Sequence, residues 1–524
     1  MPSDATISAA RALIATFTAR DTESVVNAIP NAEAWAWLEA HIPFFECPDP
    51  VIQTAYYFRW WTFRKHIRRT PAGYVITEFL PEVSWAGAHN TIACAAGHHL
   101  YEGRWLREPG FARDYLRFWF TPEAAPRFCA WWASDAALAL HRVHPDLGYL
   151  RAVLPDLLAH DAAWERHYRD ANGLFWHLDT PNEDGCSGEG MEYSLGGSGC
   201  RPSFNSYMYG DARALAELAE LAGDAATARA YRGKAAALKA RVQALLWDDD
   251  AHFFKTLPTE TALEQHWRCD GAGYTIRRDI LPRHAPGALV DVRELIGYVP
   301  WYFNLPDAGY EAAWAQLLDP RGFLAPYGPT TCERRHPLFM TDYLHDCLWD
   351  GPSWPYATAQ TLTALANLLN HYAQAVISAE DYLRLLHGYA RSHQLARPDG
   401  RVDWWIDENL HPDTGVWLAR HVHETQWGDC SERGKDYNHS TFCDLVITGA
   451  AGLRPRTDGA LEVNPLARAW DWFRLDDVPY RGHAVTITYD RTGDRYGAGP
   501  GLRVLVDGEV AAAREAMGKI IVTL

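Results

Sequence analysis

The feature of this sequence that most constrains its fold is a repeated alternation of amphipathic helix and loop. Between residues 206 and 222 the apolar side chains recur at three- and four-residue steps, which is the period of an α-helix. Gly223 is a typical residue to end that helix, and Asp224 is a typical N-cap for the next one. Two helices joined by so tight a turn are predicted to form an antiparallel hairpin.

The same pattern extends over most of the chain. A second pair of helices is predicted at residues 356–371 and 379–391, where Ser378 and Asp381 form a loose capping box. Further helices are expected at residues 51–67, 136–143 and 157–168. We therefore expect a large α-domain of helical hairpins over residues 48–453, preceded by a helical extension over residues 1–47.

After Leu453 the character of the sequence changes. Alternating or β-branched runs separated by Gly and Pro clusters occur at residues 461–464, 484–489, 502–508 and 519–524. The glycine-rich stretch 496–501 lies between two of these runs and is interpreted as a hairpin turn. Residues 454–524 are predicted to form a small β-sandwich or β-sheet domain. The fold class is thus mainly α, with β structure at the C-terminal end.

Charge and composition exclude several classes of partner. The net charge of −17 would repel nucleic acid, and no segment offers the roughly 20 uninterrupted apolar residues that span a bilayer. The N-terminal stretch reads as an amphipathic helix and not as a signal peptide. The ten cysteines include no CxxC pair, so we expect buried thiols in a reducing compartment, with the cytoplasm as the default location.

The aromatic content points toward carbohydrate. The chain has 23 Trp, 25 Tyr and 19 Phe. Trp and Tyr present flat apolar faces with a polar handle, which suits ligands that are partly apolar and partly hydroxyl. Part of this excess is expected to form an aromatic-rich helical core.

Three loop motifs carry residues suited to chemistry. Residues 188–194 (GEGMEYS) place Glu189 and Glu192 in a glycine-rich loop ahead of a helix. Residues 349–355 (WDGPSWP) lead into a helix and offer two tryptophans as walls for a sugar ring, with an aspartate to bind hydroxyls; these are Trp349, Trp354 and Asp350. Residues 406–418 set a third acidic pair before a Pro-x-Thr-Gly turn.

Glycoside hydrolysis needs two carboxyl groups, one on each side of the scissile bond. One must hold a proton for the leaving oxygen, and Glu192 is suited to this role because desolvation in an aromatic setting raises a carboxyl pKa. Glu408 is suited to be the base that activates water, with Glu432 as its rival. We expect Glu189 to support the loop.

These motifs resemble those of a known family. GMEYS resembles the Gly-Met-Asp-x-Ser of trehalase-like six-hairpin glycoside hydrolases, WDGPSWP resembles their Trp-x-Gly-Pro-x-Trp, and ENLHPDTG (residues 408–415) resembles their Glu-Asn-x-x-Pro-x-Thr-Gly. The similarity is greatest to the branch of processing α-glucosidase I and mannosylglycerate hydrolase. The resemblance implies an (α/α)6 toroid and an inverting mechanism, with Glu192 as general acid and Glu408 as general base.

The sequence also departs from that family. The acid is Glu192 where relatives usually have Asp, and Asp350 stands where they often have Arg. An early Trp-Asp sugar-binding motif is replaced by SWAGAHN (residues 84–90), and an extra segment at about residues 416–432 follows the base motif. We therefore expect the enzyme class, but not the substrate, to transfer. The predicted substrate-binding residues are Trp85, His89, Asn90, Arg201, Asn205, Tyr207, Trp349, Asp350, Trp354, Glu432, Asp436 and His439.

The sequence-based hypothesis is an inverting exo-glycosidase acting on a small oligosaccharide or glycoside. One alternative on the same toroid is a polysaccharide lyase or sugar epimerase that uses Tyr193, Tyr437 or His439 for proton transfer. Another is a carbohydrate-binding protein without catalysis. No HExxH motif or evenly spaced His/Asp cluster occurs, so we expect no metal and no cofactor. The sugar, its anomer, the aglycone and the oligomeric state are left open.

Overall fold

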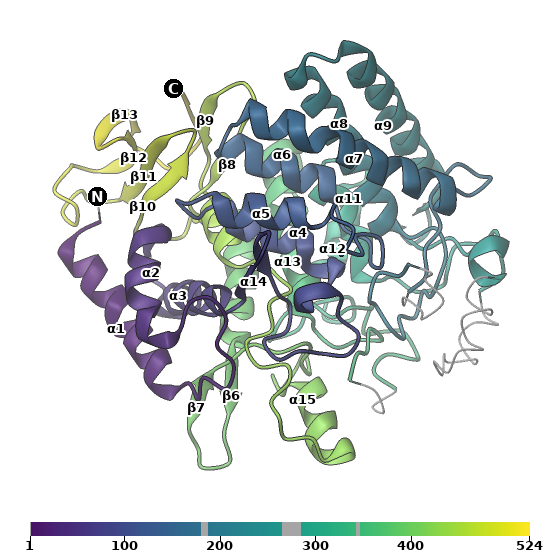
Figure 1. Cartoon of the computed structure of the whole chain (residues 1–524), viewed down its shortest axis with the longest axis horizontal. Coiled ribbons are helices and arrows are strands. Elements are labelled where there is room, and N and C mark those ends of the chain that lie inside the picture. Colours follow the sequence, from purple (N-terminus) through teal and green to yellow (C-terminus); the bar gives the residue numbers. More distant parts are fainter. Residues whose placement is uncertain (1, 180–186, 265–283, 342–345) are drawn as a thin grey trace.

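The computed structural model describes residues 2–179, 187–264, 284–341 and 346–524 (Figure 1). Gly185 and Cys186, which precede the acid loop, lie outside these ranges. The described chain is a body of helices with a β unit on one flank. The longer helices are α1 (Asp4–Arg20), α2 (Ala34–His41), α3 (Pro50–Lys65), α4 (Ala96–Gly103), α5 (Gly110–Phe118), α6 (Ala133–Val143), α7 (Leu147–Tyr168), α8 (Pro202–Ala222), α9 (Ala225–Leu245), α13 (Pro355–His371) and α14 (Ala379–Ser392).

Shorter helical pieces complete this body. They are η1 (Asn31–Glu33), η2 (Ala88–Asn90), η3 (Ala93–Ala95), η5 (Leu295–Tyr298), α11 (Val299–Tyr302), η6 (Glu311–Trp314), α12 (Ala315–Leu318), α15 (Leu418–Val422), η7 (His423–Trp427) and η8 (Leu445–Ala450).

The α8–α9 hairpin forms as its sequence predicts. Gly223 ends α8 with φ at 91°, a left-handed conformation that glycine adopts without strain. The side chain of Asp224 then accepts a hydrogen bond from the Thr227 backbone and so caps α9. The predicted capping box of Ser378 and Asp381 is also present at the start of α14. Local sequence therefore sets where these helices begin and end.

The inner helices follow one another around a ring. α4 packs on α6, α6 on α8, α8 on α11, α11 on α13, and α13 on η8. Other long helices pack against this ring, with α7 and α9 on α8, α5 on α4, and α14 on α13. α14 also packs on α3, and α1 and α2 pack on α3 in turn. This arrangement is the (α/α)6 toroid that the sequence predicts.

A buried carboxylate helps to close the ring between its first and last members. Glu102, near the end of α4, accepts backbone hydrogen bonds from Phe442 (3.1 Å), Cys443 (2.8 Å) and Asp444 (2.8 Å), directly before η8. The first N–H groups of a helix have no partner within the helix, so an acceptor there is stabilising. Glu102 therefore serves as a cap supplied by a distant helix.

We expect Glu102→Ala to destabilise the protein by about 2–4 kcal/mol, because the change leaves buried N–H donors without an acceptor. The free energy of unfolding in urea measures this loss. The matched control is Glu217→Ala on α8, whose half-buried carboxylate accepts no backbone N–H in the described structure and pairs with Arg142. Equal losses in both variants would contradict the capping role.

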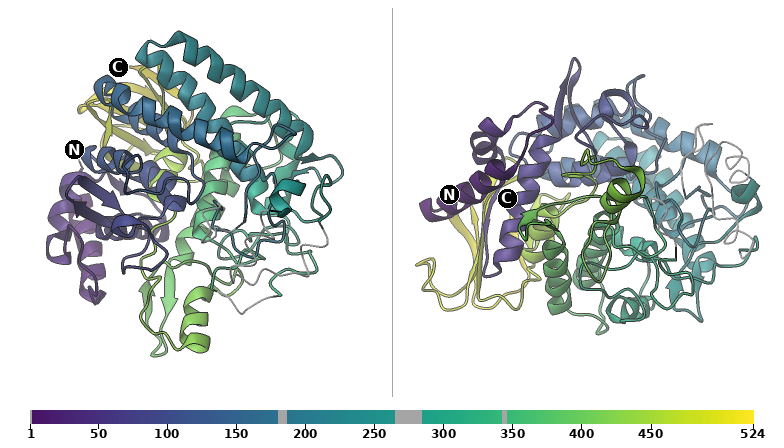
Figure 2. Two further views of the ribbon diagram at one scale, coloured as in Figure 1. Left: turned by 45° about the vertical axis from the view of Figure 1, so that its right-hand side comes forward. Right: turned by 90° about the horizontal axis from the view of Figure 1, so that it is seen from below.

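The β structure lies beside the N-terminal helices in every view (Figures 1 and 2). One sheet has the order β1-β10-β11-β12-β13 and the other has the order β14-β9-β8. The strands are β1 (Phe44–Glu46), β8 (Leu453–Pro455), β9 (Ala460–Val463), β10 (Trp472–Tyr480), β11 (His483–Asp490), β12 (Gly501–Val506), β13 (Glu509–Arg514) and β14 (Ile520–Thr523). Because β1 pairs with β10, both ends of the chain build the larger sheet, which the sequence does not predict.

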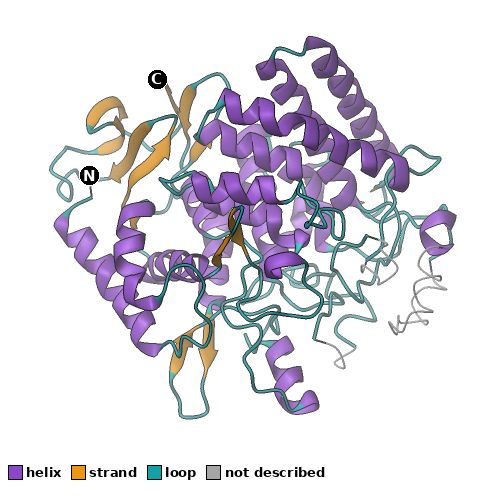
Figure 3. Cartoon of the chain, in the orientation of Figure 1, coloured by secondary structure: helices purple, strands orange, loops and turns teal. Residues whose placement is uncertain are grey.

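The loops gather on one side of the helices (Figure 3). Three small hairpins occur among them: β2 (Ile67–Thr70) with β3 (Gly73–Ile76), β4 (Trp247–Asp248) with β5 (Phe253–Phe254), and β6 (Gln394–Ala396) with β7 (Val402–Trp404). α8 and α13 each begin with proline at this side, at Pro202 and Pro355. None of the described helices is long and apolar enough to cross a bilayer.

Candidate active site

A cavity of about 730 Å³ lies where these loops meet. Its lining combines carboxylates with aromatic rings, as a sugar site requires. The carboxylates are Glu78, Glu189, Glu192, Asp346 and Glu408; the rings are Phe79, Trp85, Phe128, Trp349, Trp354, Tyr356, Trp427, Tyr437 and His439; the other lining residues are Ser84, Ile92, Cys94, Cys129, Gly190, Cys347 and Arg433.

The acid loop reaches the cavity through unusual backbone turns. Gly190 and Tyr193 both have positive φ, at 68° and 61°. A side chain at Gly190 would also meet Cys94, whose Sγ lies 3.1 Å from the position of the missing Cβ. Both features favour glycine at that position, and Glu192 lies near Cys347, whose thiol contacts its Oε2.

Hydrogen bonds connect the three sequence motifs to one another. The Trp349 backbone N–H donates to the Glu192 carbonyl (3.1 Å), which joins the first motif to the second. Ser353 and Leu410 exchange two backbone hydrogen bonds of 3.0 Å, which joins the second motif to the third. Segments that are far apart in sequence therefore place Glu192 and Glu408 on the same cavity.

Stacked aromatic side chains form one wall. Trp349 and Trp354 lie with ring centroids 4.6 Å apart and an interplanar angle of 18°. Trp354 is held in place because its Nε1 donates to the Leu348 carbonyl (2.7 Å). Such a wall offers a flat apolar surface to a sugar ring.

Glu408 lies in a strongly acidic setting. Burial and the nearby charge of Asp346 raise the pKa of Glu408 well above its ordinary value, while Arg433 opposes this shift. The Glu408 backbone N–H donates to Asp407 (2.9 Å), and burial raises the pKa of Asp407 as well. Glu408 consequently keeps its proton to a higher pH than an exposed glutamate does.

Asp346 organises the mouth of the cavity. It contacts Arg433 and, at 2.9 Å, His423. The Arg433 guanidinium lies over Trp85 at 4.9 Å and over Trp427 at 5.9 Å from the ring centroids, and both rings are about half exposed. Trp427 and His423 belong to the extra segment noted in the sequence, so this segment contributes to the rim.

Sequence analysis does not find Glu78, and it names the partner of Glu78, Tyr437, only for the lyase or epimerase alternative. The Tyr437 hydroxyl donates to Glu78 Oε1 (2.6 Å), and the ring of Tyr437 lies 3.9 Å from that of His439. Burial raises the pKa of Glu78 to about 8; the hydrogen bond from Tyr437 opposes this shift and the charge of Glu192 adds to it. Glu78 follows the β2–β3 hairpin in a segment without a recognisable motif, so no signal marks it.

The structure brings about half of the predicted site residues into the cavity. Those that line it are Trp85, Glu192, Trp349, Trp354, Glu408 and His439. Burial lowers the pKa of His439 well below its ordinary value, so its ring is neutral. Glu189 also lines the cavity and pairs with the buried Arg201 at 2.8 Å, an arrangement that suits loop support.

The other predicted substrate-binding residues do not line the cavity, because their polar groups hold the protein together. Asn90 bonds the backbone of Phe79, Pro81 and Val83, and Asn205 bonds Phe175 and Arg201. His89 pairs with Glu123, and the Tyr207 hydroxyl accepts from Gln360. Arg201 and Asp350 are fully buried.

Asp436 and Glu432, which are also predicted to bind substrate, pair with basic side chains instead. Asp436 pairs with Lys65, and Glu432 pairs with Arg397 and Arg420, both at 3.1 Å. The carboxylate of Glu432, the rival base, is therefore bound by two guanidinium groups, and Glu432 is not among the residues that line the cavity. Among the described residues, no group of three or more His, Cys, Asp or Glu side chains is arranged to hold a metal ion.

The expectation that all cysteines are free thiols is wrong for one pair. Cys94 and Cys129 form a disulfide in the cavity wall, and six other described cysteines are free. The bonded pair flanks the acid loop, since Cys129 forms a bridge with Gly188 and Cys94 contacts the loop at Glu189. The sequence cannot reveal this pairing, because the two residues meet only through the tertiary fold.

The chain matches known proteins over most of its length. Residues 88–440 match the family model of the mannosylglycerate hydrolase MGH1-like glycoside hydrolase domain. A solved structure titled "Sialidase" shares 40% identity over 99% of this chain with a TM-score of 0.87, and this chain spans 44% of that one.

More distant structures share the fold alone. A GH78 family rhamnosidase of Bacillus sp. GL1 matches over 88% of this chain and 41% of its own, at 12% identity and a TM-score of 0.54. An α-L-rhamnosidase from Dictyoglumus thermophilum matches over 92% and 49%, at 11% identity and a TM-score of 0.50. With its toroid, its three connected motifs and the family match over residues 88–440, the chain belongs to the MGH1-like glycoside hydrolases.

Proposed function

We propose that this protein is an inverting exo-glycosidase in which Glu192 is the general acid and Glu408 is the general base. The observation that carries this proposal is the connection of both carboxylate loops to the residues 349–355 loop, so that both side chains line one cavity. Two carboxyl groups on one sugar site are the requirement for glycoside hydrolysis.

In the proposed reaction Glu192 gives its proton to the leaving oxygen. Glu408 in its ionised form removes a proton from the attacking water on the opposite face of the sugar. The wall of Trp349 and Trp354 holds the ring of the cleaved sugar. The aromatic lining, with Trp85 and Trp427 at the mouth of the cavity, supports an exo mode, in which a terminal sugar enters the cavity.

The charged residues of the cavity determine the pH range and the substrates of the activity screen. Since Glu408 must be ionised to act as a base and its pKa is raised, activity should be screened from pH 5 to 9. The panel should include neutral aryl glycosides and disaccharides, together with mannosylglycerate and sialosides, which the names of the family and of the 40% identical structure suggest. Arg433 is the basic side chain in the described lining that would meet an anionic substrate.

The stereochemistry of the first product tests the mechanism. We expect ¹H NMR of the first-formed sugar, before mutarotation, to show the anomer opposite to that of the substrate. A retained anomer would refute the inverting mechanism, and an unsaturated ring detected by ultraviolet absorbance would support the lyase alternative. The cavity does not favour that alternative, because burial raises the pKa of Tyr437 well above its ordinary value and so opposes phenolate formation.

A further inference from the structure

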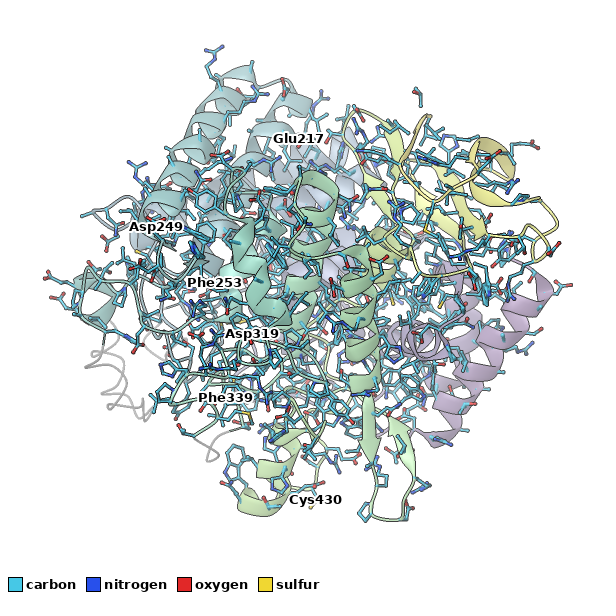
Figure 4. The ribbon with its side chains drawn as sticks, turned by 180° about the vertical axis from the view of Figure 1, so that it is seen from behind. Glu217, Asp249, Phe253, Asp319, Phe339 and Cys430 are labelled. Carbon is cyan, nitrogen blue, oxygen red and sulfur yellow. A yellow bond between two sulfur atoms is a disulfide. The ribbon has the colours of Figure 1, made fainter. Side chains whose placement is uncertain are left out.

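A second cavity, of about 250 Å³, lies toward the other ends of the helices that begin at the active site. Its lining includes Glu217 of α8 and His371 of α13. Tyr356 and His371 are about 22 Å apart along α13, at 1.5 Å per residue. Figure 4 shows Glu217 near the β strands, at the opposite end of the molecule from Cys430 in the segment after α15.

The lining of this cavity is rich in arginine. Five guanidinium groups come from different elements of the fold: Arg104, Arg142, Arg213, Arg454 and Arg456. Three of them are neutralised by lining carboxylates, in the pairs Arg104–Asp444 (2.6 Å), Arg142–Glu217 (2.8 Å) and Arg456–Glu462 (2.7 Å). The fourth lining acid, Asp135, accepts from Tyr101, and burial raises its pKa.

The other two arginines of the lining are bound to neutral acceptors. Arg213 on α8 donates to the Phe303 carbonyl (2.9 Å), and Arg454 on β8 donates to Asn367. Neither forms an ion pair with a carboxylate within the part of the chain that the structure describes. They approach the cavity from the helical toroid and from the strands that follow it.

Charges of both signs act on Arg454 beside the cavity. Burial lowers the pKa of Arg454, the charges of Asp444 and Glu462 oppose this shift, and the charge of Arg104 adds to it. Burial, with Arg454, also lowers the pKa of His371 to about 4, so this histidine is neutral. Arg454 is partly buried and forms no ion pair in the described structure, and an anion between it and the exposed Arg213 would offset the cost of that burial.

We propose that this second cavity binds a small dianionic oxyanion, either free phosphate or the phosphate group of a small ester, between Arg213 and Arg454. The planar fork of a guanidinium group matches two phosphate oxygens, and two such forks face the cavity. The bound anion would connect α8 to β8 and so link the toroid to the β unit. This site is independent of the glycosidase reaction.

The experiment uses the full chain and inorganic phosphate as the probe. We expect isothermal titration calorimetry to show saturable binding with a stoichiometry of one, and thermal unfolding to show a higher Tm in phosphate than in chloride at equal ionic strength. Arg213→Met should weaken phosphate binding at least tenfold, and Arg454→Met should do the same. Arg401→Gln, a matched change at an exposed arginine that pairs with Asp399, should bind as the wild type does.

Two further arms separate the alternatives. Glu408→Gln should bind phosphate with unchanged affinity, which shows that the anion does not occupy the active site. Glycerol phosphate binding more tightly than inorganic phosphate would identify an ester as the ligand, and the reverse order would identify free phosphate. The proposal is overturned by a lack of saturable binding, by wild-type affinity in Arg213→Met, or by a changed phosphate affinity in Glu408→Gln. Arg213 is exposed on α8, so its variant tests the site even if Arg454→Met fails to fold.

Discussion

Replacing Glu192 or Glu408 by glutamine is expected to lower kcat by about 10²–10⁴-fold, because each change removes one partner of the acid–base pair. Glutamine keeps the size of the side chain and its polar contacts but cannot give or accept the proton. The fold should stay intact, since Glu192 is only partly buried and the backbone bonds that connect the three motifs are unaffected. The measurement is kcat and KM on the best substrate of the screen, with circular dichroism to check folding.

Glu432→Gln is the matched control for the base. Its carboxylate is bound to Arg397 and Arg420 and does not line the cavity, so near-wild-type kcat is expected. A large loss in Glu432→Gln with full activity in Glu408→Gln would transfer the role of base to Glu432. Azide rescue of Glu408→Ala would further support the base role, because a small external anion can replace the missing carboxylate.

Glu189→Gln is the control for the acid. Glu189 is buried against Arg201, and burial raises its pKa although Arg201 opposes this. We expect this variant to lose stability more than it loses kcat, since it weakens a buried ion pair. Full activity in Glu192→Gln together with an inactive but folded Glu189→Gln would assign the acid to Glu189.

The helical part of the fold is predictable because its signals are local. Gly223, Asp224, Ser378 and Pro355 each act within a few residues of their own position, and the structure confirms all four as helix boundaries. Strands β1, β8, β10 and β13 lie outside the four runs that the sequence predicts as β structure. β10 contains the sequence DDVP and a register shift between Leu475 and Val478, so its alternation is interrupted.

The site is predictable only in part for a related reason. Glu192, Trp354 and Glu408 lie in motifs next to helix starts or tight turns. In such motifs the local sequence determines the backbone conformation and so the location of the side chain. Glu78 and Asp346 reach the cavity from loops whose sequences show no pattern, so only the tertiary fold brings them in. Asn90 was expected to bind substrate, but its amide is used to hold the backbone of its own loop. Buried backbone groups need hydrogen-bond partners, and a polar loop side chain such as that of Asn90 supplies them.

Glu78→Gln is expected to remove a large part of the pH dependence of stability. In the unfolded chain a glutamate ionises near pH 4.5, whereas burial raises the pKa of Glu78 to about 8 in the folded protein. Between these values the unfolded state releases the proton that the folded state keeps, so stability falls as pH rises through this window. At about 1.4 kcal/mol per pKa unit the loss amounts to several kcal/mol above pH 8.

Glutamine carries no such proton, so Glu78→Gln should match the wild type near pH 4.5 and become progressively more stable than it toward pH 8. Tm at a fixed scan rate, measured from pH 5 to 9, follows this difference, which we expect to reach a few degrees for a chain of this length. Glu432→Gln is again the control and should keep the wild-type slope. Parallel curves for Glu78→Gln and the wild type would refute the raised pKa. The stability cost falls on a carboxyl group of the cavity lining, whose Oε2 has no hydrogen-bond partner in the described structure.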